Sequence, residues 1–137
     1  MQLLALAGDL GPNWFHTVLR ALVLLARSGE QMSSKEIADA VGTDPTAVRK
    51  MFARLAKSNL IIARGGRNGG YSLAVAPCDI TIGHVYRIMG AAQNTNPSSV
   101  KQTGAEPFIA DIVLKAEQQF QAYLDEFTIS DILEVTV

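Results

Sequence analysis

The chain has 137 residues, of which 48% are hydrophobic and 18% charged, and its formal net charge at pH 7 is −1. This composition is that of an ordinary globular protein of one domain, which excludes extended disorder, and no apolar run reaches the ~18 residues of a membrane-spanning helix. One cysteine, Cys78, and two histidines exclude an intrachain disulfide and a cysteine-rich zinc or iron–sulfur site built by one chain. We therefore predict a soluble, cytoplasmic protein that has no metal site and does not bind membranes.

The charged residues are unevenly distributed along the chain. Residues 1–75 include nine basic and five acidic residues, whereas residues 76–137 include three basic and eight acidic ones. A basic first half and an acidic second half indicate two roles, and a polyanion is the candidate partner of the first. An imbalance of this size also arises by chance, so the positions of the charges have to decide between the two interpretations.

Two helices are predicted near the start of the chain. Residues 13–28 have apolar side chains at helical spacing, and Gly29 is of the residue type that often ends a helix. Ser33 and Glu36 form a capping box that predicts the start of a second, shorter helix, which Gly42 closes.

A third helix is predicted only two residues later, from Asp44 to Ser58. Asp44 is a good capping residue, and Pro45 suits the first helical position, where its missing N–H has no cost. Asn59 can adopt the left-handed conformation that ends the helix. The apolar stripe expected to face the core consists of Val48, Met51, Phe52 and Leu55.

A β-hairpin is predicted after the third helix. Residues 60–64 and 71–75 have strand character, and the six residues between them include four glycines, which suit a tight turn. A short helix follows at residues 81–89, and the polar residues that come next are typical of a loop.

A long helix is predicted from Phe108 to about Phe127, followed by a helical turn at residues 129–133. Its apolar stripe, ~30 Å long at 1.5 Å per residue, exceeds what a small core needs, so we predict an association surface. The alternative is that the stripe packs on its own domain. The predicted dimer contacts are Ile109, Ile112, Val113, Ala116, Phe120, Tyr123 and Leu124.

Two helices joined by a very short turn and followed by a hairpin are typical of a winged helix-turn-helix, a mainly α fold with a small β-hairpin wing. In this arrangement the third helix can enter the major groove of DNA. Arg49, Lys50, Arg54 and Lys57 lie on its side opposite the apolar stripe, and residues 46–77 contain no acidic residue. This uniformly basic face favours DNA as the partner.

Each basic residue of the third helix has a plainer interpretation as well. The helix dipole alone explains cations in the last turn, such as Arg54 and Lys57, but it disfavours cations early in a helix, such as Arg49 and Lys50. Arginine and lysine can read guanine, so Arg49 and Lys50 are the candidates for base contacts. Arg54 and Lys57 are expected to contact phosphates, which position the protein without specifying sequence.

The tip of the hairpin offers a second candidate contact. Arg67 and Asn68 project between glycines, with Arg64 just behind them, and a narrow minor groove attracts arginine. A flexible surface turn is the alternative. The full set of predicted DNA contacts is Ser34, Lys35, Thr46, Ala47, Arg49, Lys50, Arg54, Lys57, Arg64, Arg67 and Asn68.

These segments together resemble the Rrf2 family of bacterial winged-helix transcription regulators. The similarity lies in residues 19–26 (LRALVLLA), 33–61 and 64–90, and the TISDIL sequence of residues 128–133 also fits. The most specific part is the glycine-rich wing followed by Tyr, Leu and a Pro-x-x-Ile-Thr sequence. The resemblance implies a homodimer held by the long C-terminal helix, with operator contacts from the third helix and the wing.

Two features depart from the family pattern. Sensing members carry three cysteines in the loop that here spans residues 91–106 and contains none, so the chain resembles a cluster-free branch without a cofactor. Residues 1–12 form an extension ahead of the first helix. The expected organisation is this extension, a winged-helix domain at 13–90, a loop at 91–107, and a dimerisation helix and tail at 108–137.

We therefore expect a DNA-binding transcriptional repressor that binds a pseudo-palindromic operator as a homodimer. An enzyme is not expected, because the sequence offers no nucleophile–base pair and no paired carboxylates. Two alternatives remain: a winged-helix module that binds protein, and a thiol-based redox-responsive repressor that uses Cys78. Because no basic residue neighbours Cys78 in sequence, we expect a partly buried structural thiol instead.

Overall fold

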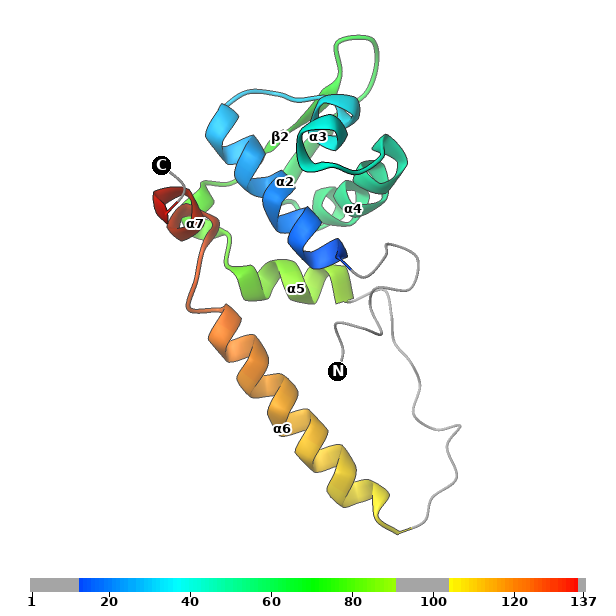
Figure 1. The fold of residues 1–137 in the computed structure, drawn as a ribbon, viewed down its shortest axis with the longest axis vertical. Helices are drawn as coiled ribbons and strands as arrows, with labels where there is room; N and C mark the ends of the chain where they lie inside the picture. Colours follow the sequence, from blue (N-terminus) through cyan, green and yellow to red (C-terminus); the bar gives the residue numbers. More distant parts are fainter. Residues whose placement is uncertain (1–12, 91–103, 136–137) are drawn as a thin grey trace.

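A computed structural model describes residues 13–90 and 104–135 (Figure 1). In chain order its elements are α2 (Trp14–Ser28), α3 (Ser34–Val41), α4 (Pro45–Lys57), β1 (Ile61–Arg64), β2 (Gly70–Leu73), the 3-10 helix η1 (Pro77–Asp79), α5 (Ile82–Gly90), α6 (Glu106–Leu124) and α7 (Ile129–Val135). The predicted fold, mainly helical with one small hairpin, is confirmed. The extension at 1–12 and most of the predicted loop, residues 91–103, lie outside the described residues.

The helices of the helix-turn-helix begin where their capping residues predict. Ser33 Oγ accepts a hydrogen bond from the Glu36 N–H at 3.1 Å, and Glu36 Oε1 accepts one from the Ser33 N–H at 3.2 Å. Asp44 Oδ1 accepts from the Ala47 N–H at 2.9 Å. These bonds satisfy N–H groups that a helix leaves unpaired at its start. They fix the short turn between α3 and α4, which begins at Gly42 with a φ of 81°.

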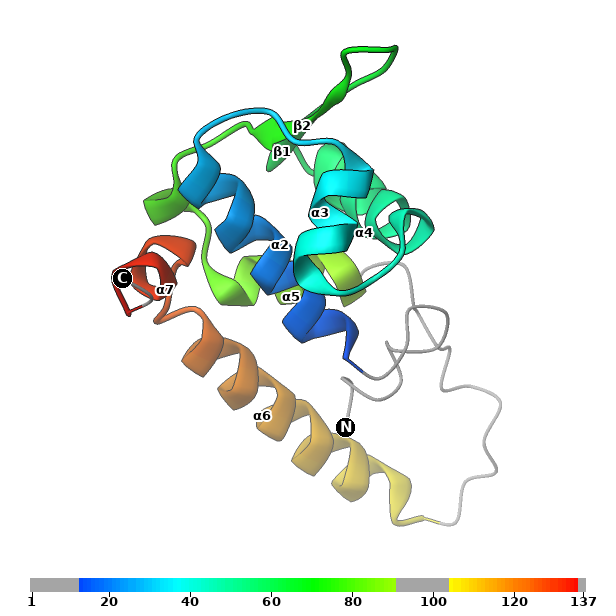
Figure 2. The same ribbon diagram turned by 45° about the horizontal axis from the view of Figure 1, so that its top comes forward.

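The hydrophobic core lies between α2, α3, α4 and α5, and α7 closes one side of it (Figure 2). Its largest fully buried side chains include Trp14 of α2, Phe52 of α4 and Ile129 of α7. The apolar stripe predicted for α4 is buried as expected. Because this stripe faces the core, the opposite side of α4 faces solvent.

The hairpin pairs β1 with β2 in antiparallel fashion, with Ile61 opposite Leu73. Each strand has four residues rather than the five predicted: β1 begins one residue later than expected, and β2 begins one residue earlier and ends at Leu73. One more backbone hydrogen bond, from the Ala74 N–H to the Leu60 oxygen at 2.9 Å, extends the pairing beyond the strands. The segment before α3 joins the hairpin, since Met32 and Tyr71 exchange backbone hydrogen bonds of 2.9 and 2.7 Å. A Cβ atom on Gly70 would lie 2.7 Å from the Met32 carbonyl oxygen, so this close approach requires glycine.

Helix α6 extends away from the rest of the domain, and the hairpin projects at the opposite end of the molecule in both views (Figures 1 and 2). The helix begins at Glu106 rather than at Phe108, because Pro107 suits the first turn of a helix. It ends at Leu124 rather than at Phe127. No helix in the described ranges is both long and apolar enough to cross a bilayer.

Candidate nucleic-acid interface

The exposed side of α4 brings together residues predicted from separate segments. Arg49 and Lys50 are exposed, and the Arg49 guanidinium donates hydrogen bonds to Thr46 Oγ1 at 3.2 Å and to Ser34 Oγ on α3 at 3.3 Å. Ala47, one residue after Thr46, is half-buried. The neutral hydroxyl partners orient the guanidinium without cancelling its charge.

The exposed cations of α3, α4 and the hairpin form what we call the basic surface. Its members are Lys35, Arg49, Lys50, Lys57, Arg64 and Arg67. Within residues 13–90 and 104–135, none of the six has a carboxylate within 4.0 Å. A solvent-exposed helix face without a partner usually carries charges of both signs. Unpaired charge of one sign is available to a polyanion, so the geometry fits the predicted nucleic-acid contact.

A groove of about 400 Å³ lies between the start of α3 and the hairpin. Ser34 lines it from α3, and Arg64 and Arg67 line it from the hairpin, together with the glycines of the turn. The charged side chains that line the groove, Arg64 and Arg67, are both positive. The Glu36 carboxylate caps the adjoining helix start at Ser33 and offsets part of the positive charge there. The sequence predicts a DNA contact for each of Ser34, Arg64 and Arg67 separately. The structure places all three around one groove, whose arginines could bind a phosphate.

The tip of the hairpin is held in place by a side chain that the sequence did not predict. Gln31 Nε2 donates a hydrogen bond of 2.6 Å to the backbone oxygen of Asn68. The pairing of Met32 with Tyr71 carries Gln31 to the hairpin, and no local sequence pattern indicates that pairing. Arg67 and Asn68 are both exposed, so their contact with DNA stays a prediction.

Arg54 lies differently from the other basic residues of α4. It is half-buried, and its Nη1 donates a hydrogen bond of 3.1 Å to the backbone oxygen of Met89 at the end of α5. One nitrogen of the Arg54 guanidinium is therefore engaged within the domain, and the predicted phosphate contact at Arg54 stays a prediction. Helical periodicity places Arg54 on the border of the exposed side but cannot show that α5 packs against that border.

The prediction of a partly buried thiol at Cys78 is wrong, because this residue is exposed. Pro77 starts the 3-10 helix η1, whose short turn carries Cys78 on the surface. Within the residues that the structure describes, no three side chains of His, Cys, Asp or Glu lie together as metal ligands would. His16 and His84 are both exposed.

The predicted association stripe on α6 divides into two parts. Ile109, Ile112 and Val113 are each more than half exposed, at 54%, 51% and 54%, and Ala116 and Tyr123 are exposed as well. Phe120 and Leu124, by contrast, pack partly against the core of their own domain. The remaining exposed apolar residues are unusual for the surface of a monomer.

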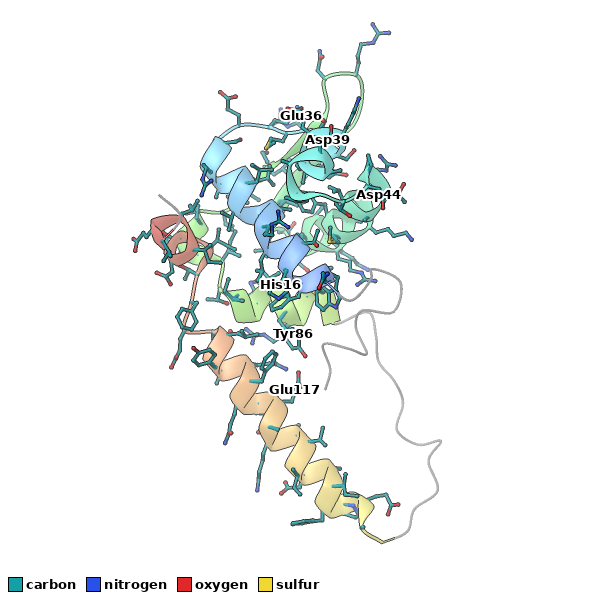
Figure 3. The ribbon with its side chains drawn as sticks, viewed as in Figure 1. His16, Glu36, Asp39, Asp44, Tyr86 and Glu117 are labelled. Carbon is teal, nitrogen blue, oxygen red and sulfur yellow. The ribbon has the colours of Figure 1, made fainter. Side chains whose placement is uncertain are left out.

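The inner part of α6 meets α5 through a contact that the sequence did not predict (Figure 3). The buried Tyr86 hydroxyl donates a hydrogen bond of 2.6 Å to Glu117 Oε1. Burial, together with this bond, raises the pKa of Tyr86 well above its ordinary value. Arg87 pairs with Asp125 at 2.9 Å, and this hydrogen bond lowers the pKa of the Asp125 carboxyl.

Comparisons with known proteins agree with this geometry. The model of the Rrf2 family, described as "Iron-dependent Transcriptional regulator", matches residues 13–135. The chain is 35% identical over 83 residues to the "Putative HTH-type transcriptional regulator YwnA" of Bacillus subtilis (strain 168), a match covering 56% of this chain and 62% of YwnA. The chain therefore spans less than two thirds of the length of that relative.

Two solved structures have a similar fold. The structure of T. potens IscR superposes with a TM-score of 0.69 at 25% identity and covers 90% of this chain and 85% of its own. The structure of CymR (YrzC), the global cysteine regulator of B. subtilis, gives a TM-score of 0.65 at 22% identity and covers 91% of this chain and 94% of its own. The likeness to CymR concerns the fold alone.

Proposed function

The chain belongs to the Rrf2 family of transcriptional regulators, and we propose on this premise that it is a repressor that binds pseudo-palindromic double-stranded DNA as a homodimer. The observation that carries the proposal is the basic surface: six exposed cations on α3, α4 and the hairpin, without carboxylate partners among the described residues. Such a surface neutralises phosphates and releases their counterions, which is the main source of affinity for DNA.

In the proposed complex α4 lies in the major groove. Arg49 then reads guanine O6 and N7, because its guanidinium is oriented by Ser34 and Thr46 and is not paired with an acid. Lys57, near the end of the helix, contacts a phosphate and adds affinity without sequence preference.

The hairpin contacts the neighbouring backbone in this proposal. The groove between α3 and the hairpin receives a phosphate, with Ser34 and Arg64 as donors. Arg67 at the exposed tip reaches into the adjacent minor groove, where a narrow A·T-rich segment attracts arginine.

The exposed part of α6 supports the proposed homodimer. Ile109, Ile112 and Val113 would be covered by the same stripe of a second copy, which gives a two-fold symmetric interface. A two-fold dimer presents its two α4 helices to successive major grooves and therefore reads half-sites in inverted orientation. Repression then results when the bound dimer blocks access to the promoter.

The family description names iron, and this chain does not offer the ligands for it. The sequence has one cysteine and two histidines, and residues 91–106 contain neither. Cys78 lies in η1 among the described residues, without a second cysteine to complete a cluster or mononuclear site. A set of three or four cysteines is what iron–sulfur ligation needs. The proposed regulation therefore does not use an iron–sulfur cluster held by this chain.

The proposal is tested by DNA selection and by the salt dependence of binding. Genomic fragments retained by the full chain are sequenced, and the recovered duplex is titrated by fluorescence anisotropy between 50 and 200 mM salt. We expect the affinity to fall by about 10³ over this range if six or more phosphates are contacted. Equal affinity at both salt concentrations, or the absence of any enriched duplex, would contradict the proposal.

A charge-reversal pair locates the contact. Replacement of both Arg49 and Lys50 by Glu should abolish binding of the selected duplex. The matched control Arg20→Glu changes an exposed cation of α2 outside the basic surface and should leave the affinity within about threefold. If the chain is instead a module that binds protein through apolar contacts, heparin will not displace its partner and neither variant will change DNA binding specifically.

A further inference from the structure

Arg54 belongs to the proposed recognition helix and yet turns its charge away from the basic surface. Its guanidinium reaches the Met89 carbonyl oxygen on α5 at 3.1 Å and is partly buried there. We propose that Arg54 is a positioning residue rather than a phosphate contact. It fixes α4 on α5, and the Tyr86–Glu117 contact extends this link to α6, so that these residues determine which half-site spacing the protein accepts.

The Arg54 contact is well suited to hold two helices at a fixed angle. Met89 lies in the last turn of α5, where backbone carbonyls lack partners within the helix and carry partial negative charge. A guanidinium that donates to such a carbonyl makes a charge-assisted hydrogen bond. Partial burial excludes part of the water that would compete for it, so the bond ties α4 to the end of α5.

One helical turn earlier on α5, Tyr86 makes the corresponding contact with α6. Its hydroxyl donates to Glu117 Oε1 at 2.6 Å, and only 3% of the residue is exposed. The Tyr86 ring packs edge-on against Phe120 of α6 and Phe15 of α2, with centroid distances of 5.2 and 5.7 Å. The packing of the ring and the hydrogen bond of the hydroxyl together hold α6 against α5 at Tyr86 (Figure 3).

A second attachment joins the end of α6 to α5. Arg87 donates two hydrogen bonds to the Asp125 carboxylate, at 2.9 and 3.1 Å. A Cβ atom on Gly83 would meet the same carboxylate, with Oδ1 as the nearest atom and the Asp125 backbone nitrogen at 3.1 Å, so the small residue at Gly83 lets the Asp125 side chain lie against α5. Helix α6 is thus joined to α5 near Glu117 and again at Asp125.

The consequence concerns the dimer and therefore rests on the proposed function. If α6 holds two copies together, the orientation of each α4 relative to its own α6 sets the distance between the two recognition helices. That orientation is transmitted through α5 by the bonds of Arg54 and Tyr86. Weakening either bond should make the dimer tolerate half-sites at other spacings, although no residue that contacts DNA has changed.

The experiment uses the full chain and the highest-affinity duplex recovered from a random-sequence library. Derivatives of that duplex carry one base pair inserted or deleted between the half-sites, and binding is followed by fluorescence anisotropy. The unaltered protein should bind the derivatives ~tenfold more weakly, as a displaced half-site loses contacts comparable to a mismatch. Arg54→Gln and Tyr86→Phe should each reduce the difference in affinity between the best duplex and its derivatives to about threefold or less. The reduction should come mainly from weaker binding to the best duplex.

Lys57→Gln is the matched control, since it removes one charge from an exposed position of the same helix. It should weaken binding to all duplexes by the same factor and so leave unchanged the ratio between the affinities for the best duplex and for its derivatives, which we call the spacing ratio. It should also reduce the slope of log affinity against log salt by the amount expected for the loss of about one phosphate contact. Arg54→Gln should leave the salt slope unchanged. A slope reduced as in Lys57→Gln, or an unchanged spacing ratio, would overturn the proposal.

Variants of Glu117, which is half-buried, give an independent test should Tyr86→Phe lose stability. Glu117→Gln retains an oxygen that accepts from the Tyr86 hydroxyl and should keep the spacing preference, whereas Glu117→Ala should lose it. If Glu117→Gln and Glu117→Ala showed the same spacing preference, the proposed role of the Tyr86–Glu117 contact would be wrong. If the unaltered protein binds no duplex in a salt-dependent manner, the proposed function itself is wrong, which distinguishes the two failures.

Discussion

The ring of Tyr71 on β2 packs edge-on against Phe52 of α4, with ring centroids 4.9 Å apart and ring planes at 88°. Phe52 is fully buried, so this contact joins the hairpin to the core side of the proposed recognition helix. Tyr71 also exchanges backbone hydrogen bonds with Met32. The positions of the hairpin and of α4 therefore depend on the same side chain.

Removing the Tyr71 ring should destabilise the domain. We expect Tyr71→Ala to lower the free energy of unfolding by about 2–3 kcal/mol, somewhat less than for a fully buried aromatic residue, because Tyr71 is half-buried. Urea denaturation followed by circular dichroism measures this change. Tyr71→Phe keeps the ring contact and should stay within about 0.5 kcal/mol of the unaltered protein; a loss as large as that of Tyr71→Ala would show that the hydroxyl, not the ring, matters.

Substitutions at two positions of α4 should affect DNA binding differently, because one residue is proposed to contact bases and the other a phosphate. Arg49→Ala should reduce discrimination between the selected duplex and single-base variants of it, because a lost bidentate contact to guanine is worth about 1–3 kcal/mol. Lys57→Ala should instead weaken binding to all duplexes by a similar factor. Competition titrations with a panel of variant duplexes measure both effects, and identical profiles for the two variants would show that their roles are misassigned.

The close approach of the hairpin to Met32 should not tolerate a side chain at Gly70. A Cβ atom there would lie 2.7 Å from the Met32 carbonyl oxygen, so Gly70→Ala must displace one of the two segments. We expect a loss of about 1–3 kcal/mol in unfolding free energy and weaker DNA binding through the displaced hairpin. Gly65→Ala is the control, because nothing lies within 4 Å of its Cβ position. Equal melting temperatures for both variants would argue against the close approach.

The exposed stripe of α6 should be required for association. Ile112→Glu places a charge in the middle of the stripe and should convert the proposed dimer into a monomer, as measured by analytical ultracentrifugation. The monomer should also bind the selected duplex much more weakly, because it contacts one half-site at a time. Val135→Glu changes an even more exposed apolar residue on α7, and it should leave the oligomeric state unchanged. A monomeric unaltered protein would refute this prediction directly.

The stability of the domain should depend on Tyr86 at alkaline pH. Burial raises the pKa of Tyr86 above its ordinary value of 10.0, so the folded state holds this proton more tightly than the unfolded state. The stabilisation is complete below pH 10 and is lost as the pH rises through the folded-state pKa. The melting temperature should therefore fall less steeply above pH 10 in Tyr86→Phe than in the unaltered protein. Tyr123→Phe, at an exposed position, should follow the unaltered protein; equal slopes for all three would contradict the shift.

The features predicted correctly from the sequence are those encoded locally. The caps at Ser33 and Asp44, the left-handed Asn59 and the buried stripe of α4 depend on residues within one or two helical turns of each other. The basic residues on the other side of α4 follow from the same periodicity. A single sequence therefore predicts the helix-turn-helix and the side of α4 that faces solvent, while the DNA contacts of that side stay a prediction.

The features that were missed depend on how distant elements pack. Arg54 meets Met89 across 35 positions, and Gln31 meets Asn68 across 37, so neither pairing leaves a pattern in a short window. Tyr86 is an ordinary apolar position of α5 in the sequence, and only the path of α6 gives it a hydrogen-bond partner. The exposure of Cys78 likewise follows from the 3-10 turn at Pro77 rather than from its neighbours' charges.

The hairpin and the exposed part of α6 lie at opposite ends of the molecule and share no residue. In the proposed complex, selection for a new DNA sequence can therefore act on Arg49 or Arg67 without altering the surface through which two copies associate. Under the same proposal, two paralogues in one cell that diverge at Ile109 and Ile112 would avoid mixed dimers while they recognise the same DNA sequences.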